Sequence, residues 1–337
     1  MAWLLGVLLG LCGGVAQAAD TLRIGGKRFT EAYILVELLG QTARAAGTPV
    51  ELKPGLGNTA IVYAALKAGS IDLYPEYTGT IALEIVKDPG ATGLAALNDR
   101  LRPLGLGVAV PLGFNNGYAL AMRDDVAARR GIARLSDLAR HPDLRLGLSN
   151  EFIGRADGWP GLARRYGLTQ RPQGLDHGLA YDALAAGQVD MIDIYTTDAK
   201  IKQLGLRVLH DDAAHFPRYE AVLLYRLDVP QRFPAGWAAL QRLQAGIDER
   251  TMIALNARAE IDSVGFERIA REHLGASAVG TAAPAGVPTA LAGRFVDKLF
   301  GPDLARLTVQ HLGLVAAAVA LAVVIGVPVA LAVAPHP

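Results

Sequence analysis

Cysteine is almost absent from this chain of 337 residues, which contains only Cys12. Cys12 lies in an apolar N-terminal segment, so a mature protein without that segment has no cysteine and no disulfide framework. Neither sign of charge is in excess, because 33 basic and 32 acidic residues give a formal net charge of +1. A nearly neutral chain has no excess of basic residues with which to attract a nucleic acid or an anionic membrane surface.

Catalytic motifs are scarce as well. The seven histidines are scattered, with no His-Glu-x-x-His motif and no pair at the spacing of metal ligands. There is no Gly-x-Ser-x-Gly elbow and no phosphate-binding loop. The glycine-rich loop Gly55–Thr59 reads equally well as a plain turn in which Asn58 or Thr59 caps a helix. We therefore expect no metal, no cofactor and no enzyme activity.

Residues 1–19 have the character of a signal peptide. An apolar run is followed by small residues, with Ala16-Gln17-Ala18 as the expected cleavage site. The run has no basic residue before it, which departs from the usual pattern, but it is too short for a stable membrane anchor. A buried helix is the alternative, and we expect export.

The long uncharged stretch lies at the other end of the chain. Leu312 to Ala334 has no charged residue over 23 positions, which suffices for one membrane crossing at about 1.5 Å per residue. We predict that residues 307–337 form a transmembrane helix that starts a permease-like segment and attaches the protein to the plasma membrane; a buried core helix is the alternative. Residues 276–306 begin with a run of Ala, Gly and Pro and are interpreted as a linker.

Between these ends, short apolar runs alternate with amphipathic stretches, the pattern of an α/β protein. The first helix is expected near Thr30, and the second from Thr59 to about Ala68. The buried face of the first helix is predicted to carry Ile34, Leu35, Leu38 and Leu39. Strands are expected at Thr21–Gly25, Val50–Lys53, Ile71–Tyr74, Leu144–Leu148, Val189–Asp193 and Leu206–Leu209.

Two extended stretches, Gly107–Met122 and Tyr219–Leu227, lack this alternation. They read as passages between two lobes, because a lobe entered by one strand and left by another forms a two-strand hinge. We assign residues 20–117 and 219–275 to the first lobe and residues 118–218 to the second. Closure about such a hinge is how binding proteins enclose a ligand.

Four loops at expected strand ends each contain a tyrosine: Tyr77, Tyr118, Tyr195 and Tyr219. Strand ends in open α/β sheets border the ligand crevice. Aromatic faces attract quaternary ammonium groups, which have no N–H to donate. A single such tyrosine is more often half-buried packing, but four at the expected cleft favour a cation site. Lys27 and Arg155 lie in loops near the same places, where either alone reads as a surface charge.

From Thr21 to about Leu274 the chain resembles the glycine betaine, carnitine and choline receptors of osmoprotectant ABC importers. The tail from Leu307 resembles the start of the permease of the same importers. The resemblance rests on these ordered motifs: Ile24-Gly25-Gly26-Lys27, Phe29-Thr30-Glu31, Leu56-Gly57-Asn58-Thr59, Ile71 to Thr80, Asn115 to Leu120, Ser136-Asp137-Leu138, Glu151-Phe152, Arg155 with Asp157-Gly158, Tyr195 to Asp198, Asp211-Asp212, Phe216-Pro217 and Tyr219.

The resemblance implies the two-lobed periplasmic binding protein fold of type II, with two hinge strands. It implies an aromatic box of the four tyrosines, completed by the backbone carbonyl of Asn116. A carboxylate at the other end of the ligand would be held by Lys27, Thr80 and Arg155. Three departures from the family pattern are Gly26 for serine, Ala32 for glutamine and Gly117 for threonine, and Ala32 leaves the exact ligand in doubt.

The expected protein is therefore a periplasmic receptor for a glycine betaine-like zwitterion that works with an ABC permease and its ATPase. Choline has no carboxylate and would leave Lys27 and Arg155 unpaired. In the family, a carboxylate at the position of Thr80 suits choline, and threonine suits betaines. A choline or ergothioneine receptor is the first alternative. A sensor that does not transport is the second, and it would carry a signalling domain after the membrane helix.

Overall fold

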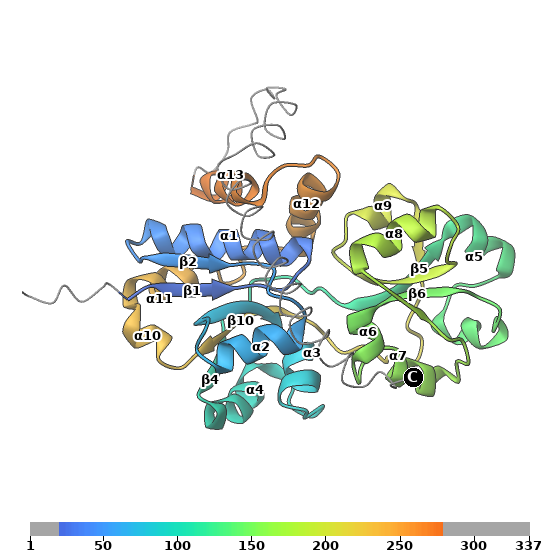
Figure 1. Ribbon diagram of the computed structural model, residues 1–337, viewed down its shortest axis with the longest axis horizontal. Helices are drawn as coiled ribbons and strands as arrows, with labels where there is room; N and C mark the ends of the chain where they lie inside the picture. The colour runs from blue at the N-terminus through green and yellow to red at the C-terminus, as the bar shows by residue number, and fades with distance from the viewer. Residues whose placement is uncertain (1–19, 279–337) are drawn as a thin grey trace, which may run out of the picture. The chain divides into compact units, whose positions relative to one another are not determined.

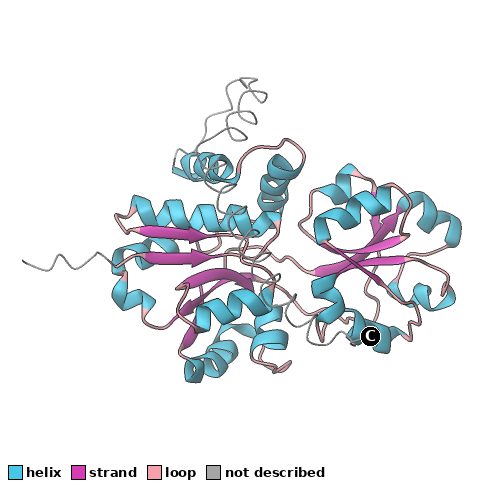
Figure 2. Ribbon diagram, in the orientation of Figure 1, coloured by secondary structure: helices cyan, strands magenta, loops and turns pink. Residues whose placement is uncertain are grey.

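The computed structural model describes residues 20–278, which belong to one compact unit. The expected signal peptide and residues 307–337 lie outside the described residues, as does the linker from residue 279. Two five-stranded sheets form the described part, each flanked by helices on both faces (Figures 1 and 2). Within residues 20–278, no helix is long and apolar enough to cross a membrane.

The first sheet and its helices are called the first lobe. Its sheet has the order β2 (Val50–Lys53), β1 (Leu22–Gly25), β3 (Leu73–Tyr77), β10 (Ala221–Arg226) and β4 (Leu106–Ala109). Its helices are α1 (Thr30–Ala45), α2 (Thr59–Lys67), α3 (Thr78–Thr80), the π-helix η1 (Ile81–Ile85), α4 (Gly93–Leu101), the 3-10 helix η2 (Arg102–Leu104), α10 (Val229–Arg232), α11 (Pro234–Gln241), α12 (Glu249–Glu260) and α13 (Phe266–Ala278).

The second lobe has the same design. Its sheet has the order β7 (Gln173–Leu175), β6 (Leu146–Ser149), β8 (Met191–Tyr195), β5 (Tyr118–Arg123) and β9 (Leu206–Val208). Its helices are α5 (Asp124–Arg130), the 3-10 helix η3 (Leu135–Arg140), α6 (Asn150–Gly154), α7 (Trp159–Tyr166), α8 (His177–Ala185) and α9 (Lys200–Gln203). In each sheet, four strands run in one direction and one strand is antiparallel to both of its neighbours: β10 in the first and β5 in the second.

The antiparallel strands follow the two passages of the chain between the lobes. The chain leaves β4 at Ala109 and enters β5 at Tyr118, and it returns from Val208 to Ala221. The two passages pair with each other, since Asn116 N donates to Tyr219 O at 2.9 Å and Ala221 N to Phe114 O at 3.0 Å. The first passage is not the single extended run that the sequence predicts, because Val110 has a φ of 54° just after β4.

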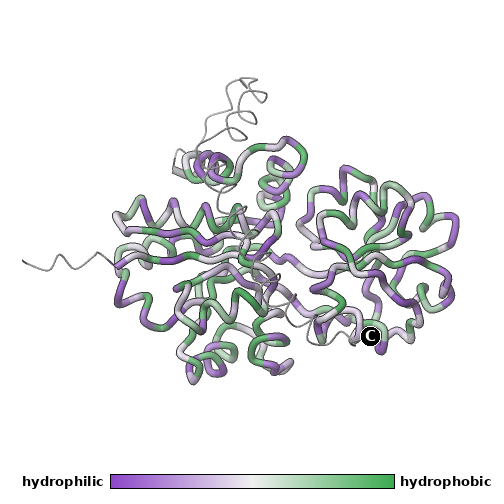
Figure 3. The backbone as a smooth tube through the Cα atoms, viewed as in Figure 1, coloured by the Kyte–Doolittle hydropathy of each residue, from purple (hydrophilic) through white to green (hydrophobic). Residues whose placement is uncertain are grey.

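Hydrophobic periodicity accounts for the packing of the helices, along which apolar and polar residues alternate (Figure 3). The four predicted residues of α1, Ile34, Leu35, Leu38 and Leu39, are all buried against the first sheet. Asn58 caps α2 by accepting a hydrogen bond from Ile61 N at 3.2 Å, as one of the two expected caps. β1 and β2 lie where they were predicted, whereas β3, β6 and β8 each start two residues later.

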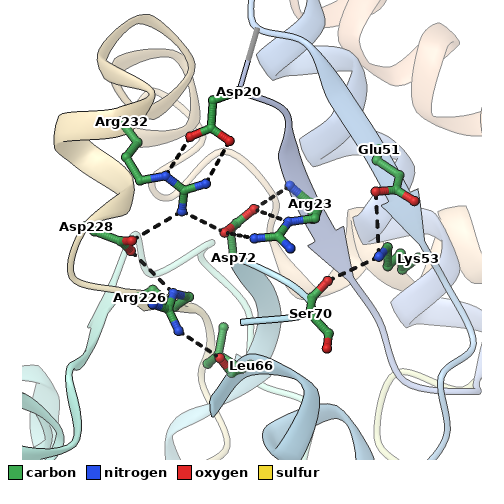
Figure 4. Close-up of polar contacts among 10 residues, drawn as sticks. All are labelled: Asp20, Arg23, Glu51, Lys53, Leu66, Ser70, Asp72, Arg226, Asp228 and Arg232. Atoms are coloured by element: carbon green, nitrogen blue, oxygen red, sulfur yellow. Dashed lines mark hydrogen bonds and ion pairs between the residues drawn. The ribbon is translucent and has the colours of Figure 1, made fainter. Parts of the chain in front are cut away.

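β3 starts directly after Asp72, whose side chain is turned toward Arg23 (Figure 4). The carboxylate of Asp72 is fully buried and accepts from the backbone N, Nε and Nη2 of Arg23 at 2.8–3.0 Å. Arg232 Nη1 adds a fourth bond at 2.9 Å. In the second lobe, Arg145 and Asp190 repeat the three arginine bonds before β8 at 2.8–3.0 Å.

We expect Asp72→Asn to lower the free energy of unfolding by roughly 2–3 kcal/mol, because two arginines lose their buried counter-charge. Burial alone would raise the pKa of Asp72, but the bonds from Arg23 and Arg232 outweigh it and lower the pKa. The stabilisation is therefore present above the unfolded pKa of about 3.9 and is lost as pH falls through the lower folded value. Denaturant unfolding measures it, with Asp143→Asn as the control, because Asp143 forms an exposed pair with Arg130. Equal losses in both variants would contradict the assignment.

Candidate functional site

The strand pairing brings the four predicted tyrosines together. Tyr118, at the start of β5, lies directly opposite Tyr195, at the end of β8. Tyr77 ends β3 and pairs with Ala221. Tyr219 therefore lies two residues before the residue that faces Tyr77. Gly79 permits this approach, because a Cβ there would come within 2.7 Å of the ring of Tyr219.

One small cavity of about 10 Å³ touches seven of the eight predicted site residues. It is lined by Lys27, Phe29, Tyr77, Thr80, Asn116, Tyr118, Tyr195 and Tyr219. The volume matches about one water-sized sphere, so the rings are packed nearly against one another. Arg155, the eighth predicted residue, adjoins the cavity: its guanidinium lies 5.1 Å from the ring centre of Tyr118, and its Nη2 donates to Thr80 Oγ1 at 3.3 Å.

The rings form a continuous aromatic lining. Tyr118 has its ring centre 5.2 Å from that of Tyr195 and 5.7 Å from that of Tyr219, the latter edge to face. Phe29 closes the set at 5.1 Å from Tyr195 and 6.4 Å from Tyr77. All four tyrosines are at most 8% exposed. The ring faces of such a lining carry the negative part of the ring quadrupole and attract a cation that enters between them.

Two of the tyrosine hydroxyls donate to buried carboxylates. Tyr77 Oη lies 2.5 Å from Glu31 Oε1, and Tyr219 Oη lies 2.5 Å from Asp157 Oδ2. Among the described hydrogen bonds, the hydroxyls of Tyr118 and Tyr195 have no carboxylate partner, in contrast to those of Tyr77 and Tyr219. Burial raises the pKa of all four tyrosines above the ordinary value near 10, so each phenol stays neutral and remains a donor.

The two predicted cations already have carboxylate partners. Lys27 Nζ lies 2.5 Å from Glu76 Oε1, and both side chains are buried. Arg155 donates through Nε and Nη2 to the two oxygens of Asp157 at 2.8 and 2.6 Å. One atom of each pair, Glu76 Oε2 and Arg155 Nη1, is buried without a hydrogen bond. A ligand carboxylate would therefore share these cations with Glu76 and Asp157.

Glu151 reinforces this polar side of the site. It belongs to the second lobe, yet it accepts from Thr59 Oγ1 in the first lobe at 2.7 Å. Its Oε1 lies 3.7 Å from Arg155 Nη1. Burial alone would raise the pKa of Glu151, but the charge of Lys27 and the bond from Thr59 outweigh it and lower the pKa. Glu151 therefore stays ionised between two cations.

His177 lies behind the ring of Tyr195, with ring centres 4.3 Å apart. Its Nε2 is 2.9 Å from Asp198 Oδ2, and its Nδ1 is 4.0 Å from Asp193 Oδ2. Burial alone would lower the pKa of His177, but the charge and hydrogen bond of Asp198 outweigh it and raise the pKa to about 9. At neutral pH this wall of the cavity is thus backed by an imidazolium.

A wider cavity of about 350 Å³ leads away from the aromatic lining and shares Lys27, Phe29 and Tyr195 with it. The loop Gly55–Asn58 borders this cavity from the first lobe, and Ser149–Glu151 and Leu175–His177 border it from the second. It is lined from both lobes and adjoins the aromatic lining at the three shared residues. Within residues 20–278, no cluster of His, Cys, Asp or Glu could hold a metal ion.

Three residues that sequence reasoning did not assign to the site are Phe29, Glu31 and Asp157. Phe29 lines the cavity, and the two acids accept hydrogen bonds from its tyrosines. All three lie within the motifs that carry the family resemblance, which was the available signal. Their spacing alone gave no reason to place them beside the tyrosines.

Known proteins are similar to this chain over the same part that the structure describes. The family model for the substrate binding domain of ABC-type glycine betaine transport systems matches residues 20–276. A glycine-betaine-binding protein of Pseudomonas aeruginosa is 37% identical over 278 residues, 77% of this chain and 89% of that protein. An ergothioneine transport permease/ergothioneine binding protein of Helicobacter pylori is 32% identical over 262 residues, 75% of this chain and 47% of that protein. The crystal structure of a glycine betaine/carnitine/choline ABC transporter has a TM-score of 0.61 and 26% identity, and the match covers 75% of this chain and 97% of that one.

Proposed function

This chain belongs to the family of substrate-binding domains of ABC-type glycine betaine transport systems, and from that premise we propose that its cavity binds a zwitterionic quaternary ammonium compound. The fold is the two-lobed α/β fold of periplasmic binding proteins. Its role is that of a solute receptor working with an ABC permease, not that of a catalyst. The ligand and the residues that hold it are what we propose.

The observation that carries the proposal is the convergence of five aromatic rings on one cavity. A quaternary ammonium group cannot donate a hydrogen bond, so ring faces are the protein groups that attract it best. Each desolvated cation–π contact contributes about 1–2 kcal/mol. We assign Tyr77, Tyr118, Tyr195 and Tyr219 as the cage, with Phe29 as an added wall and the carbonyl of Asn116 as a further partner.

The other end of the ligand is proposed to be a carboxylate at Lys27, Thr80 and Arg155. Lys27 and Thr80 line the same cavity, and Arg155 donates to Thr80 Oγ1 at 3.3 Å. Charge-assisted bonds contribute roughly 1.5–3 kcal/mol each. Micromolar binding needs only about −8 kcal/mol, so the site suffices even after sharing the cations with Glu76 and Asp157.

Calorimetric titration of the purified chain with glycine betaine, carnitine, proline betaine, choline and ergothioneine tests the proposal. We expect one site per chain and micromolar affinity for at least one betaine, with choline weaker. Choline tighter than every betaine would reassign the ligand class. No binding by any of the five compounds would overturn the proposal.

Lobe closure is proposed to accompany binding. Contacts bridge the lobes around the cavity, including Arg28 to Asp176 at 3.3 Å and Ala156 N to Glu84 Oε1 at 3.1 Å. A ligand that touches both lobes favours the arrangement that has these contacts. Small-angle scattering is expected to give a smaller radius of gyration with saturating betaine. An unchanged radius at saturation would contradict closure about the two passages.

Export and membrane attachment are proposed from the two ends of the sequence, which lie outside the described residues. Residues 1–19 would direct the protein to the periplasm, and residues 307–337 would anchor it and begin a permease segment. The Helicobacter pylori relative carries both permease and binding protein in its name, and this chain covers 47% of it. Fractionation of cells that express the chain with and without residues 307–337 tests the anchor. An equal soluble share in both cases would count against it.

A further inference from the structure

Glu31 is a buried acid for which the proposed cage offers no obvious use. It lies in the first turn of α1 and is 2% exposed. Its Oε1 accepts from Tyr77 Oη at 2.5 Å and from Asn116 Nδ2 at 3.0 Å. Its Oε2 accepts from Thr197 Oγ1 at 2.6 Å and from Asn256 Nδ2 at 3.3 Å. Four neutral donors thus saturate one carboxylate.

What distinguishes Glu31 from the other acids around the cavity is the lack of a cation. Glu76 is paired with Lys27, Asp157 with Arg155, and Glu151 lies near Arg155. No Lys, Arg or His of residues 20–278 forms an ion pair with Glu31 within 4 Å. A buried charge without a counter-charge is costly even when it is hydrogen-bonded.

The partners of Glu31 are themselves parts of the cage. Tyr77 is one wall, and Asn116 is the residue whose carbonyl is assigned to the cation. Thr197 comes from the second lobe, two residues after the wall residue Tyr195. Glu31 therefore connects walls from both lobes through its two oxygens, without lining the cavity itself.

We propose that Glu31 is the counter-charge of the ligand's ammonium group, a positioning residue that acts through Tyr77 and Asn116. A cation among the rings supplies the partner that the carboxylate lacks. In addition, a phenol that donates to a carboxylate gains negative charge, which strengthens the attraction of its ring for a cation. This inference rests on the proposed function, since it assumes an ammonium group in the cage.

The expected consequence is that the receptor distinguishes a ligand with a cationic nitrogen from a ligand of the same shape without it. A ligand whose nitrogen is replaced by carbon, such as 3,3-dimethylbutanoate in place of glycine betaine, fills the same space but leaves Glu31 uncompensated. The receptor should therefore discriminate between these isosteres. Part of that discrimination should disappear when the carboxylate becomes a neutral amide.

Protonation of Glu31 should have the same effect. Burial raises the pKa of Glu31, although its four hydrogen bonds oppose the shift. Other titratable groups surround it: Tyr77 with the Lys27–Glu76 pair, Asp198 with His177 beyond Thr197, and Glu260 on α12. Because these groups also titrate or carry charge, the pH test needs a ligand pair that does not itself titrate.

The experiment is calorimetric titration of the full chain and of Glu31→Gln with glycine betaine and 3,3-dimethylbutanoate at pH 8. A hydroxyl can accept as well as donate, so Thr197 Oγ1 can accept from the amide nitrogen of the new side chain. We expect the ratio of the two affinities to fall roughly tenfold or more in Glu31→Gln. Glu31→Asp should keep most of the ratio, and Glu37→Gln, in the same helix, should leave it unchanged.

A purely structural role for Glu31 would weaken both ligands equally, and an unchanged ratio overturns the inference while the proposed function stands. Wild-type protein that does not prefer betaine over its isostere would instead overturn the proposed function. If Glu31→Gln does not fold, the wild type is titrated with choline and 3,3-dimethyl-1-butanol as pH is lowered from 8 to 4. Selectivity should fall with pH, and constant selectivity overturns the inference.

Discussion

Arg155→Ala is expected to weaken betaine binding by roughly 10–100-fold and choline binding much less, because choline has no carboxylate for the guanidinium to hold. Arg155 is 4% exposed, bonds both oxygens of Asp157 and contacts Thr80 and the ring of Tyr118. Paired titrations of the wild type and the variant measure the difference between the two ligands.

The same substitution is expected to destabilise the protein without ligand. It leaves Asp157 buried with the hydroxyl of Tyr219 as its remaining side-chain partner among the described hydrogen bonds, and breaking a buried pair costs about 3–5 kcal/mol. Arg155→Lys keeps the charge but loses the two-pronged geometry, so we expect an intermediate loss of betaine affinity. Equal losses for betaine and choline would mean that Arg155 only maintains the cage.

The convergence of the tyrosines was predictable because it follows from strand topology. Tyr77 and Tyr195 end strands, and Tyr118 starts the strand that pairs with the latter. Residues at the ends of neighbouring strands meet at the edge of a sheet, so a sequence that marks its strands also marks this edge. The helix face of α1 was predictable for a similar reason, since its apolar period is local.

The acids beside the cage were not predictable in this way. Glu31 meets partners 46, 85, 166 and 225 residues away in the sequence, so no local spacing reports the contacts. An acid in the first turn of a helix is ordinarily explained by the helix dipole and solvent exposure. Glu31 is buried and bonded to all four partners only because α1 packs against α12 and against the two passages between the lobes.

Lys27 and Arg155 were expected to hold the carboxylate of a ligand. The structure adds that each already forms an ion pair with a buried carboxylate. Lys27 and Glu76 are 49 residues apart, and Arg155 reaches Tyr118 across the second lobe. The pairing changes the energetics, because a ligand carboxylate must compete with a buried acid. The pairing also means that the two cations remain compensated when no ligand carboxylate is present.

Substitutions of the four tyrosines are expected to fall into two classes that follow their hydroxyl partners. Alanine at Tyr77, Tyr118, Tyr195 or Tyr219 should lose roughly 1–2 kcal/mol or more of binding free energy, because a ring face is removed. Phenylalanine at Tyr118 or Tyr195 should keep most of the affinity, since neither hydroxyl donates to a carboxylate among the described hydrogen bonds, unlike those of Tyr77 and Tyr219.

Phenylalanine at Tyr77 or Tyr219 should be more damaging, because each hydroxyl donates to a buried carboxylate that would lose a donor. Loss of one hydrogen-bond partner by a buried acceptor costs about 1–3 kcal/mol, and the ring would no longer be held in place. The losses should not add across double variants, since a cage without one wall admits water to the others. Thermal unfolding of each variant without ligand is the control that separates packing from binding. The aromatic-cage assignment is wrong if the alanine variants bind normally, or if phenylalanine is as damaging as alanine at all four positions.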